Sequence, residues 1–295
     1  MLNAHTTRRA GYPYYFLFPA LGVFALLFLT PTVTGLWYSL TDWNINTDKI
    51  NFVGLDNFRE LLADRKLVAA LVNTLIYSFS VTFLRNAIGL ILALMLNTKM
   101  RMQNLFRTLI FLPYVISPLI IGYLFTAIYQ PSHGLLNQGL RFFGLKFLAV
   151  DWLNDPSWAL FSTVMVDVWR TAGFSMVIYL AGLQMIPLEL YETAALDGAR
   201  YWKTFRHIMF PLIAPSVTVN LVLSLIGTMK VFVMILVLTN GGPGFSTEVM
   251  NTYIMGSFSL GMYGYGTAAN LLLTLLIIAL GFPVLFWLRR REVEL

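Results

Sequence analysis

Four ionisable side chains lie inside long apolar stretches of this sequence: Arg85, Asp167, Arg170 and Lys230. A charged group near the centre of a membrane-spanning helix costs roughly 2.5–3.5 kcal/mol on insertion scales, so such groups usually face protein or water. Carboxylate and guanidinium groups also make directional hydrogen bonds to hydroxyl groups. These residue types could therefore bind a polar solute inside a membrane.

The spacing of Asp167 and Arg170 leaves two interpretations open. Residues three apart share one face of a helix, so the two side chains could neutralise each other as a structural ion pair. They could instead line a solute pathway, in which Arg170 and Lys230 would suit an acidic sugar or a phosphate ester. Arg85 could simply snorkel or pair between helices, and we assign it no role.

Residues suited to covalent or metal chemistry are scarce. The absence of cysteine excludes disulfides, thiolate catalysis and cysteine-based metal sites. His5, His133 and His207 are scattered over both predicted sides of a membrane, and the motifs H-E-x-x-H, G-x-S-x-G and G-x-x-x-x-G-K-[ST] are missing. We therefore predict that the chain has no catalytic residue, no metal site and no cofactor, and that it does not hydrolyse ATP itself.

Membrane helices must position the charged side chains. Only 12% of the residues are charged and the mean hydropathy is +0.71, whereas a soluble domain has about 25% charged residues. The apolar residues form blocks of roughly 20 or more, enough to cross a bilayer core. We predict an all-α polytopic membrane protein with six transmembrane helices, at about 14–40, 67–96, 105–129, 158–185, 212–238 and 267–288.

The distribution of Lys and Arg predicts the orientation of these helices. More basic residues flank the spans on the side of the two termini than on the other side, which favours both termini in the cytoplasm of a cell membrane. The predicted organisation is a cytoplasmic N-terminus (1–13), a six-helix domain (14–288) and a cytoplasmic tail (289–295). Because topology explains the net charge of +6, we expect no nucleic-acid partner.

The longest predicted cytoplasmic segment, residues 187–211, carries signals for two short helices. Pro187 suits a first helical position, and Glu189 and Glu192 complement the dipole near the helix start. Gly198 can adopt the left-handed conformation that ends a helix. Apolar residues then recur at helical spacing opposite a basic face. This pattern fits an amphipathic helix on anionic lipid or a docking element for a cytoplasmic partner.

One motif in this segment resembles the EAA loop of ABC importer permeases. Glu192-Thr-Ala-Ala-Leu-Asp-Gly198, then Ile208 and Pro211, matches the family pattern E-A-A, three residues, G, nine residues, I, one residue, L-P. Thr193 replaces the first Ala, and Phe210 replaces the Leu. In that family the loop forms a coupling helix in a cleft of the ATPase subunit. The resemblance implies these docking residues: Glu192, Ala194, Ala195, Asp197, Gly198, Trp202, Phe205 and Ile208.

Other stretches resemble the carbohydrate-type permeases of this family, so that the resemblance covers nearly the whole chain. They are residues 52–58, 111–118, 129–137 and 238–243. In the maltose permeases, sugar contacts come from the span before the coupling loop and from the next span. Those relatives are mostly amide-rich where this chain has Asp167, Thr228 and Val231, so we expect a different substrate. The matching solute-pathway positions are Asp167, Arg170, Thr171, Phe174, Ser224, Gly227, Thr228 and Val231.

The resemblance implies a permease subunit of an ATP-binding-cassette importer that moves a sugar or related polar solute inward by alternating access. The implied partners are a second homologous permease, two cytoplasmic ATPase subunits that bind ATP and Mg, an extracytoplasmic solute-binding protein and the lipid bilayer. An ATP-independent secondary carrier and a membrane-bound enzyme are the alternatives. A carrier would transport without ATP, and an enzyme would turn over in detergent. The sequence leaves the identity and the charge of the substrate open.

Overall fold

The computed structural model of the chain describes residues 15, 17–46, 49–98 and 100–292. The predicted cytoplasmic N-terminus, residues 1–13, and the last three residues of the predicted tail lie outside the described residues. Helices dominate the described part of the chain, as predicted, and its one β-bridge, Thr41 to Phe52, is isolated.

Four helical segments are long and apolar enough to cross a membrane. The first, Leu17–Tyr38, joins α1 (Leu17–Phe24), a π-helical turn (Ala25–Leu29) and α2 (Thr30–Tyr38). The other three are α4 (Arg65–Leu96), α8 (Ala159–Gln184) and α15 (Tyr263–Arg289).

Two further spans are bent pairs of helices. The first pair is α5 (Gln103–Val115) and α6 (Pro118–Ile128), which meet at 94°. The second joins Tyr201–Leu212 to α12 (Ala214–Met229) at 67°. Counting each bent pair as one span gives up to six spans among the described residues, in line with the predicted number.

The predictions of one continuous helix at 105–129 and another at 212–238 are wrong. The first breaks at Ile116 and Ser117, which are extended. Pro118 causes this break, because proline lacks a backbone N–H and disfavours helical geometry in the preceding residue.

The second helix stops after Met229, and α13 (Val233–Leu238) follows only after three residues. The last turn of α12 tightens there, with Lys230 N–H donating to Gly227 O at 3.2 Å and Val231 N–H to Thr228 O at 3.1 Å. Irregular backbone at membrane depth is tolerated where protein or a cavity surrounds it.

Short helices complete the fold. The two-helix prediction for the loop is confirmed: α9 (Leu188–Leu196) ends before Gly198, whose φ is +69°, and α10 (Tyr201–Thr204) follows. Pro187 directly precedes the first helical residue. A π-helical turn (Phe205–Met209) and α11 (Phe210–Leu212) then lead into α12. Four elements outside the predicted spans are α3 (Asp56–Ala63), α7 (Leu135–Phe142), a 3₁₀ turn (Lys146–Leu148) and α14 (Met250–Ser259).

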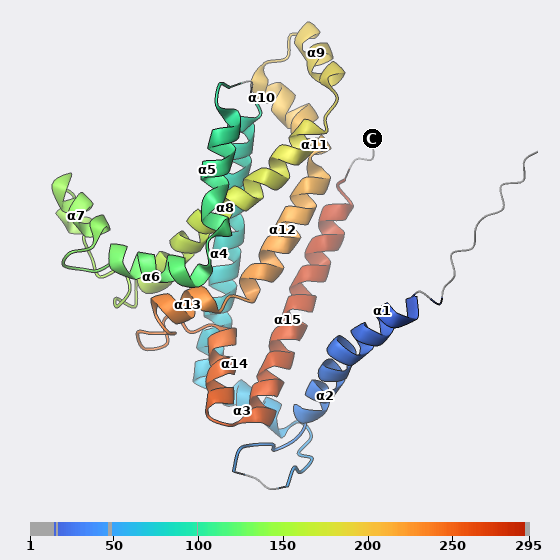
Figure 1. Cartoon of the computed structure of the whole chain (residues 1–295), viewed down its shortest axis with the longest axis vertical. Helices are drawn as coiled ribbons and strands as arrows, with labels where there is room; N and C mark the ends of the chain where they lie inside the picture. The colour runs from blue at the N-terminus through green and yellow to red at the C-terminus, as the bar shows by residue number, and fades with distance from the viewer. Residues whose placement is uncertain (1–14, 16, 47–48, 99, 293–295) are drawn as a thin grey trace, which may run out of the picture.

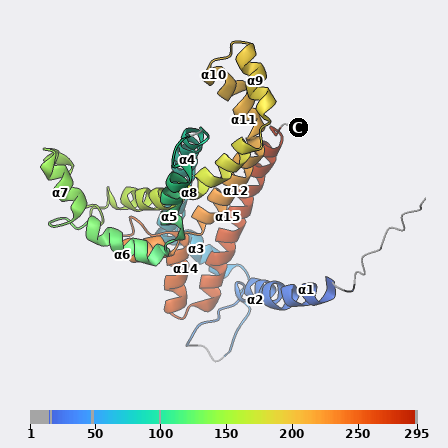
Figure 2. The ribbon, with the colours of Figure 1, turned by 45° about the horizontal axis from the view of Figure 1, so that its top comes forward.

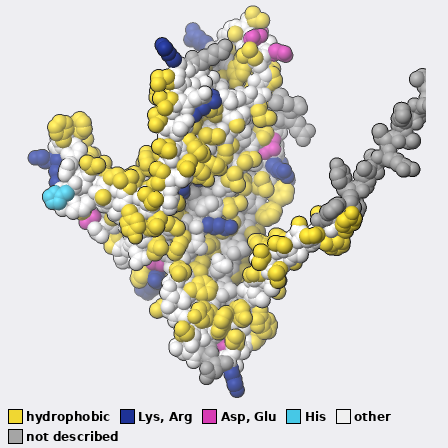
Figure 3. Space-filling model, viewed as in Figure 1, with side chains coloured by type: hydrophobic (Ala, Val, Ile, Leu, Met, Phe, Trp, Pro, Cys, Tyr) yellow, Lys and Arg dark blue, Asp and Glu magenta, His cyan; other side chains and the backbone are white. Residues whose placement is uncertain are grey.

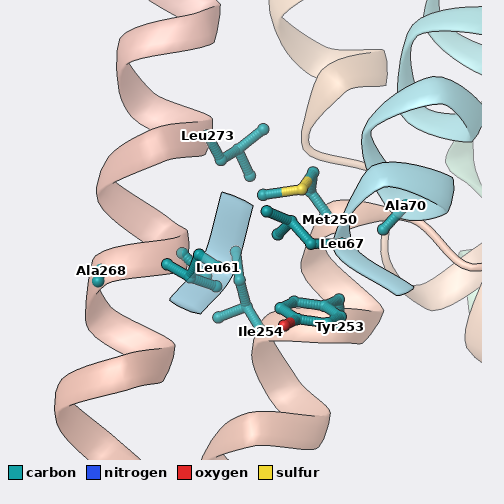
Figure 4. Close-up of a cluster of buried hydrophobic side chains, with 9 residues drawn as sticks. Leu61, Leu67, Ala70, Met250, Tyr253, Ile254, Ala268 and Leu273 are labelled. Atoms are coloured by element: carbon teal, nitrogen blue, oxygen red, sulfur yellow. The ribbon is translucent and has the colours of Figure 1, made fainter. Parts of the chain in front are cut away.

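The bundle is elongated, with α4, α12 and α15 running along it and α8 crossing it obliquely (Figures 1 and 2). The loop helices α9 to α11 lie at one end, and α3 and α14 lie near the other. A buried apolar cluster joins α3, α4, α14 and α15 at that second end (Figure 4). By contrast, α1 and α2 diverge from the bundle, and none of their residues is buried. Hydrophobic side chains cover much of the face seen in Figure 3, as expected for a surface in lipid.

Glycine allows two pairs of helices to approach closely. A Cβ on Gly89 of α4 would lie 2.6 Å from Ser175 Cβ of α8. A Cβ on Gly173 of α8 would overlap the Ile110 carbonyl oxygen of α5 and lie 3.0 Å from Phe111 Cα. Because these obstacles on α5 are backbone atoms, rotation of a side chain cannot relieve the clash.

Gly173→Ala should therefore destabilise the protein. Overpacking of this kind costs about 1–3 kcal/mol, so we expect a lower thermal unfolding midpoint in detergent and less protein in the membrane. The matched control is Gly139→Ala, in the interior of α7, where an added Cβ meets nothing within 4 Å. This control should be neutral or slightly stabilising. Equal midpoints for the two variants would contradict close packing of α5 on α8.

Candidate functional site

A cavity of about 600 Å³ lies between α5, α6, α8 and α12, next to the break that precedes α13. Both interrupted spans contribute to it, because Pro118 starts α6 and Lys230 ends α12. The lining side chains are Arg85, Tyr114, Pro118, Asp167, Arg170, Thr171, Phe174, Leu223, Gly227, Thr228, Lys230, Val231, Phe232, Val233 and Met234.

Seven of the eight predicted solute-pathway residues line this one cavity. They come from α8 (Asp167, Arg170, Thr171 and Phe174) and from α12 and the residues directly after it (Gly227, Thr228 and Val231). Their roles in solute binding stay predictions. The grouping follows from helical spacing: positions three or four apart lie on one face, and the two helices turn these faces toward each other.

Ser224 is the eighth predicted residue, and it does not line the cavity. Its side chain is fully buried, where its hydroxyl donates to Asn220 O and accepts from Asn86 Nδ2 at 3.0 Å. Tyr179 OH donates in turn to Asn86 Oδ1 at 2.6 Å. This network joins α4, α8 and α12 directly behind the cavity, so Ser224 has a structural role in this arrangement.

Asp167 is nearly buried, and both of its carboxylate oxygens are occupied. One oxygen accepts from Tyr77 OH at 2.9 Å, and the other accepts from Arg170 Nε at 3.1 Å and from an Arg170 terminal nitrogen at 2.9 Å. The ion pair that the spacing allowed therefore forms. Both of its members also line the cavity, so the pair does not exclude a solute pathway.

An aromatic pair forms part of the cavity wall. The rings of Tyr114 and Phe174 stack with their centroids 4.6 Å apart. The guanidinium of Arg85 lies 5.8 Å from the Phe174 centroid, and that of Arg170 lies 5.9 Å from the Tyr114 centroid. These distances fall within the range of cation–π attraction. The site thus combines a flat apolar surface, suited to the face of a sugar ring, with nearby hydrogen-bond donors.

Arg85 lines the cavity, although the sequence led to no predicted role for it. It is 7% exposed, and its Nε donates to Ser175 Oγ at 3.1 Å. Its position inside a predicted span was the available signal, since charged groups there usually face protein or water. Tyr114 was also missed, because it lies in the third span, from which no solute-pathway residue was predicted.

The predicted coupling loop occupies one end of the molecule, and its residues fall into two groups. Phe205 and Ile208 pack inward against the apolar cluster of α4, α8 and Met209, and Ala194 is buried. Glu192, Ala195, Asp197, Gly198 and Trp202 are exposed. The inward group can position the loop, and the exposed group can contact a partner.

Two exposed leucines of α9 were missed by the sequence analysis. Leu188 is 69% exposed and Leu196 is 89% exposed, so α9 presents apolar surface together with its acidic residues. Beside them, burial raises the pKa of the Tyr191 phenol, so this group stays neutral at physiological pH.

Comparison with known families and proteins identifies similar chains. The sequence pattern of a family described as "Binding-protein-dependent transport system inner membrane component" matches residues 85–292. The chain is 39% identical over 271 residues to the probable ABC transporter permease protein YurN of Bacillus subtilis, covering 91% of this chain and 92% of that protein. It is 34% identical over 273 residues to the trehalose/maltose transport system permease protein MalF of Thermococcus litoralis, covering 92% of each chain.

A solved structure shares the same fold over nearly the whole chain. It is a bacterial alginate ABC transporter in complex with alginate pentasaccharide-bound periplasmic protein. One of its chains superposes with a TM-score of 0.82 at 27% sequence identity, covering 94% of this chain and 93% of that one.

Proposed function

Because this chain belongs to the family of binding-protein-dependent transport system inner membrane components, we propose that its central cavity is the solute site and its 187–211 loop the contact to an ATPase. The chain is a permease subunit of an ABC importer for a sugar or a related polar solute, and it is not itself an enzyme. The carrier and enzyme alternatives are thereby set aside.

One observation carries the assignment of the solute site. A cavity of about 600 Å³ with four charged lining side chains lies among apolar helices, and it is built where two of those helices are interrupted. Ligand pockets in proteins are clefts of roughly 300–1,000 Å³ with an apolar wall and a few polar groups. The aromatic pair supplies the wall, and Asp167, Arg170 and Thr228 supply the polar groups.

The loop is suited to transmit movement to this cavity. Residues 201–212 lead into α12 through a 67° bend, and Gly227 and Thr228 in the last turn of α12 line the cavity, as does Lys230 directly after it. A partner that moves α9 or α10 therefore acts on the cavity through a single helix. The exposed part of the loop combines acidic, aromatic and leucine side chains, a mixture suited to a protein partner.

The proposed assembly contains a second permease, two ATPase subunits that bind ATP and Mg²⁺, and an extracytoplasmic solute-binding protein. The chain would span a cell membrane several times with both termini in the cytoplasm. The alginate transporter in complex with its periplasmic protein supports a binding-protein partner. The mechanism would be alternating access, with ATP-driven closure of the ATPases opening the cavity outward and hydrolysis resetting it.

The test is purification of this chain from its native membrane in mild detergent, followed by mass spectrometry and reconstitution into liposomes. An ATPase and a second permease should be recovered in stoichiometric amounts. Uptake by the liposomes should require ATP and the solute-binding protein. Recovery of this chain alone, active in transport without ATP, would refute the assignment.

A further inference from the structure

We propose that the cavity selects a solute that carries a carboxylate or phosphate group beside its hydroxyl groups, and that Lys230 binds this anionic group. The inference rests on the proposed function, because it treats the cavity as the solute site. Four observations on charge, pairing and position support it.

The first observation is the imbalance of charge around the cavity. Arg85, Arg170 and Lys230 line it on the positive side, and Asp167 is the single acidic lining residue. The other acidic residues of the sequence lie outside the predicted spans. The cavity therefore has a surplus of two positive charges in a low-dielectric setting, where charge interactions are strong.

The second observation is that both carboxylate oxygens of Asp167 already accept hydrogen bonds. Tyr77 and Arg170 together use both of its oxygens. A terminal nitrogen of Arg170 lies 2.9 Å from Asp167 Oδ1, so the two side chains form an ion pair. The Asp167–Arg170 pair is therefore close to neutral, and the surplus charge belongs to Arg85 and Lys230.

The third observation concerns the two remaining cations. Arg85 is 7% exposed and donates to Ser175, so little of its surface is available to a solute. The side chain of Lys230 is exposed and lines the cavity, and no acidic group among the described residues lies within 4.0 Å of its ammonium. Lys230 is thus the accessible cation without an acidic partner.

The fourth observation is the position of Lys230 on the backbone. It is the residue directly after α12, and its own N–H is bonded to Gly227 O. An ammonium at membrane depth is costly unless it meets water or an anion. A bound anionic solute would supply such a partner for Lys230 in the cavity.

A sugar acid or a sugar phosphate satisfies all of these features together: its ring faces the aromatic pair of Tyr114 and Phe174, and its anion meets Lys230.

The test uses the purified assembly in lipid nanodiscs and three probes of similar size: glucose, glucuronate and glucose 6-phosphate. Apparent dissociation constants come from the thermal unfolding midpoint as a function of probe concentration at constant ionic strength. We expect at least one anion to bind at least tenfold more tightly than glucose. Which anion does so distinguishes a carboxylate solute from a phosphate solute.

Three variants assign the effect to Lys230. Lys230→Met should remove the preference for the anion, and Lys230→Arg should retain it because the charge is kept. Lys146→Met, at an exposed lysine of the 3₁₀ turn that lines neither the cavity nor the loop, is the matched control and should bind like the wild type. The midpoint without any probe reports whether each variant is folded.

Three results would overturn the inference: equal binding of glucose and the anions, no binding of either anion, or a preference that persists in Lys230→Met. An assembly that imports a neutral sugar with ATP would refute the anionic solute and leave the proposed transport function intact. An assembly that fails to use ATP at all would instead refute the proposed function.

Discussion

Replacement of Gly198 by proline should abolish ATP-driven uptake while leaving the chain in the membrane. Gly198 has a φ of +69°, and its N–H donates to Ala195 O at 3.1 Å. Proline fixes φ near −65° and has no N–H, so it can satisfy neither requirement. The turn between α9 and α10 would open, and the exposed face of the loop would lose its shape. The decisive measurements are uptake and ATP hydrolysis by the same reconstituted assembly.

Two further variants separate the backbone requirement from the simple loss of glycine. Gly198→Ala should retain most uptake, because one left-handed alanine costs only about 1–2 kcal/mol and an added Cβ there meets nothing within 4 Å. Gly198→Asn should behave similarly, since asparagine tolerates this conformation. Normal uptake by Gly198→Pro would show that the loop is not the coupling element.

Asp167→Asn should both destabilise the protein and reduce uptake at least tenfold. Removing one partner of a buried ion pair typically costs about 3–5 kcal/mol. We expect the lower end of this range, because Arg170 borders the cavity and can be partly hydrated. The amide oxygen can still accept from Arg170 and the amide nitrogen can donate to the Tyr77 oxygen, so the change removes the charge and the acceptor of the Tyr77 O–H. Thermal unfolding of the assembly measures the first effect, and ATP-driven uptake measures the second.

The double variant Asp167→Asn with Arg170→Gln completes the test. If the pair is coupled as the 2.9 Å contact indicates, the double variant should be more stable than Asp167→Asn alone, because Arg170 is no longer left without its carboxylate. Its uptake should stay low, since both side chains line the proposed site. Equal stability of the single and double variants would show that the ion pair does not contribute to folding.

Helical periodicity explains why much of the site could be predicted from sequence. Asp167, Arg170, Thr171 and Phe174 fall on one face of a straight helix, so their spacing alone brings them together. The same argument failed for Ser224, which is enclosed by Asn86 and Asn220 although its neighbour Leu223 lines the cavity. The spacing of residues shows which of them share a face of a helix. It does not show which positions on that face are covered by a neighbouring helix.

The interruptions of the spans were harder to foresee. Pro118 gave a local signal for the bend between α5 and α6. Nothing equivalent marks the break after Met229, because Lys230, Val231 and Phe232 contain neither glycine nor proline. The helix that follows the break, α13, packs against α6, a contact between segments far apart in the sequence. Tyr114 lies near the end of α5, so its place in the cavity wall depends on the bend between α5 and α6.

The 67° bend at the start of α12 has a mechanical consequence. Sixteen residues at 1.5 Å each make α12 a rigid arm about 24 Å long. A rotation of about 10° at Ile213 would carry its far end through an arc of about 4 Å, more than the length of a hydrogen bond. Lys230 directly follows that far end and would move with it. A small movement of the loop would therefore be enough to move the Lys230 ammonium away from a bound anion. Release of the solute and return of the transporter to its starting conformation would then be one movement.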